Sequence, residues 1–167
     1  MISINTNISQ VAESLRIKLS ALADKDKVMR AVAVGMKTQV HYRVHTEGKD
    51  AADGQIGTYS DGYMKVRTGT FESPTIVRGK NKGKPRPMYN RTGDTKVIAS
   101  LTRQMENDMK VVATSDGYGI GYSNDLNFAK VGYLENTYKK EIFNLTPSEK
   151  EMAVAIAEEE TGKIMNE

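Results

Sequence analysis

Apolar residues recur at helical spacing in the first part of the chain. Six of them fall at positions i, i+3, i+4, i+7, i+11 and i+14, namely Ile8, Val11, Ala12, Leu15, Leu19 and Leu22. This spacing predicts an amphipathic helix of about 15 residues. A second helix is predicted from about Lys25 to Val44, because Asp24 or Asp26 can accept backbone N–H bonds at its start. Gly48 is expected to end it.

The first half of this second helix, from Val28 to Met36, is apolar on nearly every side. A helix of that kind is buried on several sides rather than along one stripe. It therefore either crosses the core or packs against a neighbouring subunit. We expect Val32 and Met36 to contribute both to folding and to a contact between subunits.

Beyond residue 95 the pattern changes to the alternation that is typical of strands. Two alternating triplets predict an antiparallel pair: Val97, Ala99 and Leu101, then Met109, Val111 and Ala113. Asp116-Gly117 marks a turn into a third predicted strand at 118–122. A short strand is predicted at 139–143, whereas 128–134 fits no pattern clearly.

The strongest local signal is the run Thr146-Pro147-Ser148-Glu149. Thr146 is placed to cap a helix, Pro147 suits its first position, and Glu149 can bond back to the cap residue. This predicts a terminal helix from Pro147 to Thr161, with Gly162 as its stop. The predicted fold is α+β within a single domain, 1–167: two N-terminal helices, a small antiparallel β-sheet and one C-terminal helix.

A long basic arm, residues 48–90, is predicted as an extended insertion in this domain. Half of the 14 glycines and three of the four prolines lie between Glu47 and Arg91. From Lys65 to Arg91 there are eight Lys or Arg against the single acid Glu72, a net charge of +7, so the rest of the chain sums to −4 to give the total of +3. Long loops without structure of their own are usually functional or disordered.

Two partners suit this arm. Its cations could contact the phosphates of DNA or RNA, or they could meet an acidic protein surface. A plain solvated loop is the third interpretation. The acidic terminal helix of a neighbouring copy is our candidate surface. The candidate partner-binding cations are Arg67, Arg78, Lys80, Lys82, Lys84 and Arg86, and their acidic counterparts are Glu158, Glu159 and Glu160.

Little in the sequence points to catalysis or to a cofactor. There is no cysteine, and therefore no thiolate nucleophile or thiolate metal site. His41 and His45 are spaced like zinc ligands, but Tyr42 stands where zinc proteases carry glutamate. The run 79–85 has three residues between its glycines, whereas a phosphate loop has four. We expect no enzyme, metal, cofactor or small-molecule substrate, and no signal peptide or membrane span is visible.

Several pieces of the chain, taken in order, resemble a known family. They are Ile56–Ser60, Tyr63–Arg67, Tyr89–Asp94, Val97–Leu101, Tyr118–Tyr122, Asn127–Glu135 and Lys140–Thr146, which leads into the final helix. Together they resemble the virion-morphogenesis or tail-completion proteins of tailed bacteriophages, the group that includes the Mu G-like proteins.

The resemblance implies a structural subunit of the phage neck or tail rather than an enzyme. A head–tail connector or tail-completion protein of this kind forms an oligomeric ring with its own copies, hexameric by analogy, and contacts other neck or tail proteins. Its place would be the virion, and the host cytoplasm during assembly. A contact with packaged DNA is left open. The alternative from another class is a nucleic-acid-binding protein that uses the basic arm at 65–91.

Overall fold

The computed structural model describes residues 25–91 and 93–165, and the helix predicted over 8–22 lies outside them. The described part is a mixture of helices and one two-stranded antiparallel sheet, which confirms the α+β class. Its elements in chain order are α2 (Lys25–Tyr42), the π-helical turn η1 (Arg43–Glu47), α3 (Asp61–Thr68), α4 (Gln104–Asp108), β1 (Met109–Thr114), β2 (Gly117–Tyr122), α5 (Asp125–Tyr138) and α6 (Pro147–Met165).

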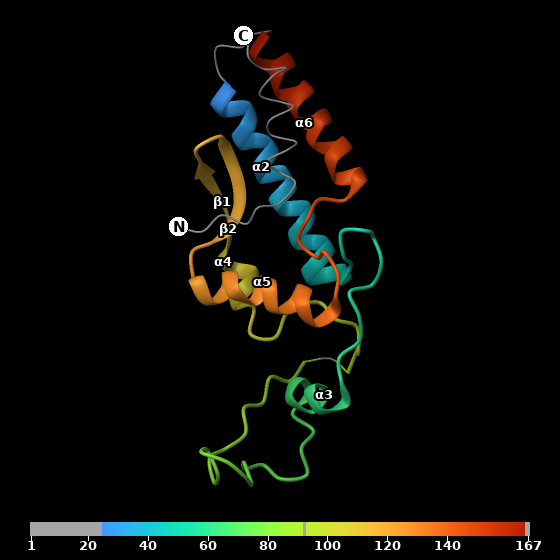
Figure 1. Cartoon of the computed structure of the whole chain (residues 1–167), viewed down its shortest axis with the longest axis vertical. Helices are drawn as coiled ribbons and strands as arrows, with labels where there is room; N and C mark the ends of the chain where they lie inside the picture. The colour runs from blue at the N-terminus through green and yellow to red at the C-terminus, as the bar shows by residue number, and fades with distance from the viewer. Residues whose placement is uncertain (1–24, 92, 166–167) are drawn as a thin grey trace.

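The molecule is elongated, and its elements follow the long axis in a simple order (Figure 1). Helices α2 and α6 lie beside each other in one half, with the β1–β2 hairpin against α2. Helix α5 crosses below them. Helix α3 and the long loop that follows it form the end of the molecule opposite to the C-terminal end of α6 (Figure 1).

Helix α2 forms the centre of the hydrophobic core. Its apolar residues pack against α6 and both strands of the same chain, and Val32 and Met36 are only 6% and 0% exposed. The expectation that these two residues contact a neighbouring subunit is therefore wrong: the chain's own elements cover α2 on several sides. The apolar side chains that α2 leaves exposed are Val34 and Tyr42.

A π-helical turn extends α2 past its predicted end and stops at Gly48. The Gly48 backbone is left-handed, with φ of 66°, and its N–H donates to the Arg43 carbonyl. A Cβ at this position would lie 2.3 Å from the Val97 carbonyl oxygen. Both the conformation and the crowding require glycine here, so the predicted stop is confirmed.

The β1–β2 hairpin has the predicted turn, but it pairs with fewer strands than predicted. Strands β1 and β2 pair from Met109 opposite Tyr122 to Thr114 opposite Gly117. The strand predicted at 97–101 does not form. Its first residue instead donates its backbone N–H to the Gly57 carbonyl, at 3.0 Å, beside an isolated bridge between Thr58 and Lys96. This segment therefore anchors the chain that leads into the arm.

The region 139–143, predicted as a strand, is irregular. The N–H groups of Ile142 and Phe143 donate to Glu135 Oε1, at 2.9 and 3.3 Å, so a carboxylate replaces the strand partner. Residues 128–134, whose pattern predicted neither helix nor strand clearly, belong to α5. Asn124 caps that helix by accepting the Leu126 N–H at 2.9 Å.

The capping box of α6 is confirmed. The Thr146 hydroxyl accepts the Glu149 N–H at 3.1 Å, and Glu149 Oε2 accepts the Thr146 N–H at 2.8 Å. Gly162 does not stop the helix, which continues to Met165. A glycine inside a helix costs only about 1 kcal/mol, so it need not end one.

Candidate functional site

The predicted arm divides into a packed base and an exposed tip. The part from Gly48 to Ile56 lies against the body, since Asp50 is 4% exposed and Ile56 is 1% exposed. Asp50 Oδ1 accepts the N–H groups of Ala52 and Gly54, and Asp50 Oδ2 pairs with Lys140 Nζ at 2.9 Å. The expectation that residues 48–90 all extend from the domain is therefore wrong for this segment.

The Asp50 carboxylate is held in its charged form by this turn. Burial acts to raise its pKa, but the Lys140 ammonium and the two backbone N–H donors outweigh burial and lower the pKa overall. This charged carboxylate, with its ion pair and two hydrogen bonds, holds the turn at 50–54 against the body. The exposed part of the arm therefore begins after this turn.

Arg67, a candidate partner-binding residue, is also part of the base. It is 2% exposed, donates from Nη1 to the Ser100 carbonyl, and lies 4.3 Å above the centre of the Tyr59 ring. Arg91 holds the same segment, donating from Nε to the Leu101 carbonyl at 2.9 Å. Burial removes Arg67 from any partner's reach, so its assignment as a contact residue is corrected to a structural one.

Tyr59 joins these contacts to the body. Its hydroxyl accepts the Ile98 N–H at 3.1 Å, and its ring lies 5.0 Å from that of Tyr63, centre to centre. Burial raises the pKa of the Tyr59 phenol, although the Ile98 N–H and the Arg67 charge act in the opposite direction. The phenol is thus a neutral hydrogen-bonding group that anchors the base of the arm.

The tip is a small exposed hairpin, residues 73–87. Ile76 N–H donates to the Lys84 carbonyl at 2.9 Å, and Arg86 N–H donates to the Pro74 carbonyl at 2.9 Å. Arg86 lies over the Phe71 ring at 4.4 Å and is half-buried. The remaining cations of the tip are exposed: Arg78, Lys80, Lys82 and Lys84. These four, rather than Arg67 or Arg86, are free to meet a partner.

The acidic candidates lie near the C-terminal end of α6. Glu158 and Glu159 are exposed, whereas Glu160 is half-buried. Lys163 pairs with Glu159 at 2.8 Å and with Glu160 at 2.6 Å, so this lysine offsets part of the negative charge. Glu158 is therefore the strongest of the three as an outward-facing acid.

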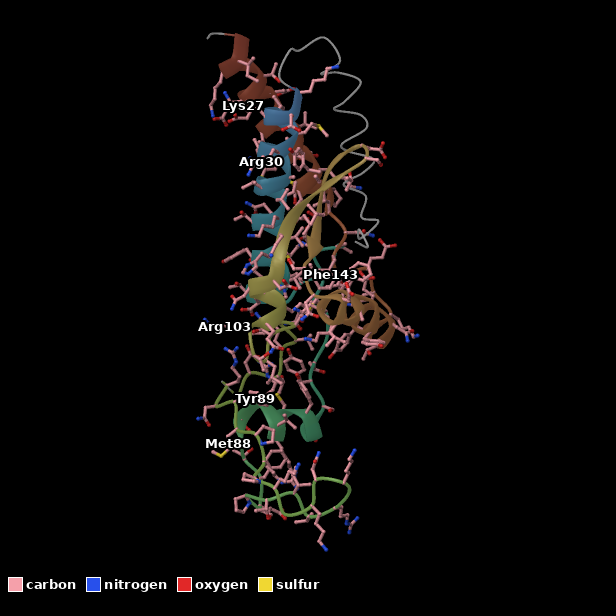
Figure 2. All side chains as sticks on the ribbon, turned by 90° about the vertical axis from the view of Figure 1, so that its left-hand side faces the viewer. Lys27, Arg30, Met88, Tyr89, Arg103 and Phe143 are labelled. Atoms are coloured by element: carbon pink, nitrogen blue, oxygen red, sulfur yellow. The ribbon has the colours of Figure 1, made fainter. Side chains whose placement is uncertain are left out.

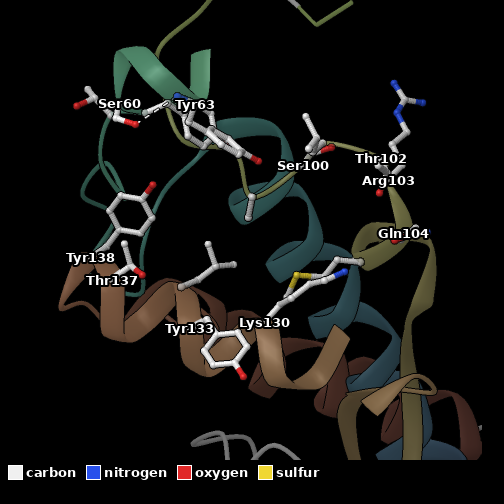
Figure 3. Close-up of a pocket in the computed structure, with 16 residues that line it drawn as sticks. Ser60, Tyr63, Ser100, Thr102, Arg103, Gln104, Lys130, Tyr133, Thr137 and Tyr138 are labelled. Atoms are coloured by element: carbon white, nitrogen blue, oxygen red, sulfur yellow. Dashed lines mark hydrogen bonds between the residues drawn. The ribbon is translucent and has the colours of Figure 1, made fainter. Parts of the chain in front are cut away.

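A groove that the sequence did not reveal runs along α5. Its first hollow, of about 680 Å³, lies between α5 and the start of α3 (Figure 3). Tyrosines line it on both sides: Tyr59 and Tyr63 from the arm, Tyr133 and Tyr138 from α5. Its charged lining residues, Arg103 and Lys130, are both cationic.

A second hollow, of about 890 Å³, continues the groove toward the start of α5 and shares Gln104, Lys130 and Tyr133 with the first. It adds Lys110 and Asp108 to the lining. The Asp108 carboxylate is already engaged, since it accepts from the Ser123 and Asn124 N–H groups and from the Asn127 amide. The groove as a whole therefore has a cationic character.

The α5 residues along the groove share one face of the helix. Leu126, Lys130, Tyr133 and Thr137 follow at i, i+4, i+7 and i+11. Leu126 is 72% exposed and Tyr133 is 69% exposed, which is high for large apolar side chains. This periodicity is present in the sequence, but the segment 128–134 gave no clear secondary structure, so its face could not be assigned.

The two histidines lie where α2 ends, His41 in its last turn and His45 in η1. Their ring centres are 5.2 Å apart, and neither ring nitrogen of His45, which is 5% exposed, has a hydrogen-bond partner. Within the described ranges, no three His, Asp or Glu side chains converge as metal ligands would. Burial lowers the pKa of His45 to about 4, with Glu106 opposing and His41 reinforcing the shift.

No protein-family model, curated protein or solved structure matches this chain. Across the residues that the structure describes, none of the helices combines the length and hydropathy needed to cross a lipid bilayer.

Proposed function

We propose that the protein is a structural subunit of a tailed-phage neck or tail, a tail-completion or head–tail joining protein that forms a ring with its own copies. The observation that carries the proposal is the position of two oppositely charged surfaces. The cationic hairpin at 73–87 and the acidic end of α6 lie at opposite ends of an elongated molecule (Figures 1 and 2).

Complementary surfaces at different places on one subunit favour a head-to-tail contact, which closes into a ring when the rotation between subunits allows it. The hairpin of one copy would reach Glu158 and Glu159 of the next. Each exposed ion pair contributes only about 0–1 kcal/mol, so the four exposed cations act together. The family resemblance of the segments from Ile56 to Thr146 supports the same role.

The experiment is a charge reversal on the tip, read by mass photometry and negative-stain microscopy. Lys80, Lys82 and Lys84, all exposed, are changed to Glu and should abolish rings. Changing Glu158 and Glu159 to Lys in the same chain should restore them. Lys25, Lys27 and Arg30 are exposed on α2, and Lys27 and Arg30 lie at the end of the molecule away from the arm (Figure 2). A triple reversal of these residues makes the same change in net charge and should leave rings intact. Failure of the combined reversal to restore rings would contradict the pairing.

A second candidate is a nucleic-acid-binding protein, which the same four exposed cations favour. Phosphate contacts make binding fall steeply with salt, about one counterion for each phosphate that a cation neutralises. Fluorescence anisotropy with a labelled DNA duplex separates the two functions. If the protein is a monomer and binds DNA in a salt-sensitive way, and if reversal of Lys80, Lys82 and Lys84 abolishes that binding, the nucleic-acid function holds and the ring proposal fails.

A further inference from the structure

The groove along α5 is open to solvent in the described part of the chain, since Leu126 and Tyr133 on its floor are mostly exposed. Its floor presents apolar and cationic side chains in one row: Leu126, Lys130, Tyr133 and Thr137. Arg103, just before α4, and Lys110, on β1, add charge to the lining, and both are exposed, although Arg103 lies 3.9 Å from Glu106. An occupant that fits must be elongated, apolar along its centre and acidic at its edges.

The outward face of α6 has the complementary pattern. Glu151, Met152, Ala155, Glu158 and Glu159 are exposed and share one face of the helix, where the small side chain of Ala155 lies between acids and Met152 lies at one edge. Met152 is 41% exposed, which is notable for a large apolar side chain on a helix that also packs into the core. Helix α6 has 19 residues and α5 has 14, and at about 1.5 Å per residue α6 is long enough to span the groove.

We infer that the groove along α5 receives the outward face of α6 from a second copy of the chain. Met152 and Ala155 lie against Leu126 and Tyr133, while Glu151 faces Lys130 or Arg103. Helix α6 stays in its own fold, because the face that docks is not the face that carries its buried residues Ala153 and Ala157. The inference rests on the proposed ring and names the surface that would carry its main contact.

The contact joins two different surfaces, so each copy offers one groove and one helix face. That arrangement is heterologous and agrees with head-to-tail association. The same neighbouring helix would bring Glu158 and Glu159 toward the arm, which begins at one wall of the groove with Tyr59 and Tyr63. The groove and the hairpin would then hold successive parts of one α6.

The test uses two variants of opposite charge. The groove variant carries Arg103→Glu and Lys130→Glu, and the helix variant carries Glu151→Lys and Ala155→Lys. Neither touches the hairpin or its acidic target. The groove variant faces the unchanged Glu151, and the helix variant faces the unchanged Arg103 and Lys130. Like charges therefore meet in either variant alone, and we expect its association to weaken at least tenfold in mass photometry. Circular dichroism should report an unchanged fold, since none of the four side chains is buried.

A one-to-one mixture of the two variants should assemble again, because each contact then pairs opposite charges. The assemblies would alternate between the two variants and contain an even number of copies. A single chain with all four changes should also recover. Like-charged variants that assemble as well as the wild type, or a mixture that stays monomeric, would overturn the inference.

The outcomes separate this inference from the proposed function. If reversal of Lys80, Lys82 and Lys84 abolishes rings while the groove variant assembles normally, the ring stands and the groove inference fails. If the wild-type protein stays monomeric at all concentrations, both fail. If the groove variant assembles normally but loses binding to a fluorescent oligothymidine, the groove takes single-stranded nucleic acid instead of α6.

Discussion

Arg43 and Glu149 form a buried ion pair that ties the end of α2 to the start of α6. Arg43 Nε donates to Glu149 Oε1 at 2.8 Å, and both side chains are less than a tenth exposed. The other Arg43 donors bond the carbonyls of Ile142 and Asn144, at 3.0 and 2.7 Å. Glu149 also closes the capping box of α6. One carboxylate thus starts the helix and fixes its position against the core.

We predict that Glu149→Ala is among the most destabilising single changes, costing about 3–5 kcal/mol because it leaves the Arg43 charge buried and unpaired. Urea unfolding followed by circular dichroism measures this loss. Glu149→Gln keeps an acceptor for the Thr146 N–H and should cost less. Glu158→Ala, an exposed glutamate on the same helix, is the matched control. Equal losses for Glu149→Ala and Glu158→Ala would show that the pair contributes nothing.

His45 should make the protein sensitive to acid. Its pKa is about 4 in the folded protein and 6.5 in a model peptide, so between these values the unfolded chain binds more protons. Stability is therefore at its full value above pH 6.5 and is lost as the pH falls toward 4, by about 3 kcal/mol. Glu106 and the backbone of Ile98 and Ala99 act to raise the pKa of His45, whereas His41 acts with burial to lower it.

The measurement is the free energy of unfolding of the wild type and of His45→Leu from pH 4 to pH 7. The difference between the two should shrink or reverse in acid, because leucine does not titrate and both His45 nitrogens lack hydrogen-bond partners. Parallel stability curves would show that His45 does not cause the acid sensitivity. His41→Gln, which alters the less buried ring, controls for the loss of any histidine.

Two glycines with similar backbones should respond differently to alanine. Gly48 and Gly79 have φ of 66° and 81°, but only Gly48 is crowded, with Val97 O 2.3 Å from the added Cβ and open space around Gly79. Gly48→Ala should therefore cost clearly more than the roughly 1 kcal/mol of the backbone conformation alone. Differential scanning calorimetry on both variants tests this. Equal melting temperatures would mean that the Val97 segment moves aside freely.

Arginines at the base of the arm should matter for stability, whereas lysines at its tip should not. Arg67→Met removes the bond to the Ser100 carbonyl in a buried place, and we expect a loss of about 1–3 kcal/mol. Lys82→Met changes an exposed side chain and should have almost no effect. Thermal melts of both variants provide the comparison. An unaffected Arg67→Met variant would show that the contact with the Ser100 carbonyl does not stabilise the fold.

Local signals in the sequence predicted the elements that depend on neighbouring residues. The capping box at Thr146 and Glu149, the turn before Gly117 and the stop at Gly48 each involve a few adjacent positions, and each is present. The burial of Arg67 could not be predicted in this way. Its partners, Tyr59 and the Ser100 carbonyl, come from other parts of the chain, and an arginine in a basic run looks the same whether it is buried or exposed.

The groove escaped prediction for a related reason. Its walls come from the start of α3, from the segment before α4 and from α5, which meet only in the folded chain. Leu126 and Tyr133 are apolar in sequence, and apolar residues are expected inside; their exposure is a property of the packing. Val32 and Met36 are the converse case. Their apolar face was expected to contact another subunit, but α6 and the β1–β2 hairpin of the same chain cover α2.

The exposed hairpin at 73–87 also makes the protein susceptible to limited proteolysis that would leave the two fragments associated. Three trypsin sites, Arg78, Lys80 and Lys82, are exposed close together on this turn, and a Cβ added at Gly79 or Gly83 would meet open space. Brief digestion should nick the protein there first. The two fragments would stay joined, because Arg67, Arg91 and the bridge between Thr58 and Lys96 hold both ends of the cut loop to the body. The nicked protein would behave as a two-chain complex, and reconstituting it from separately made halves would allow each half to be labelled on its own.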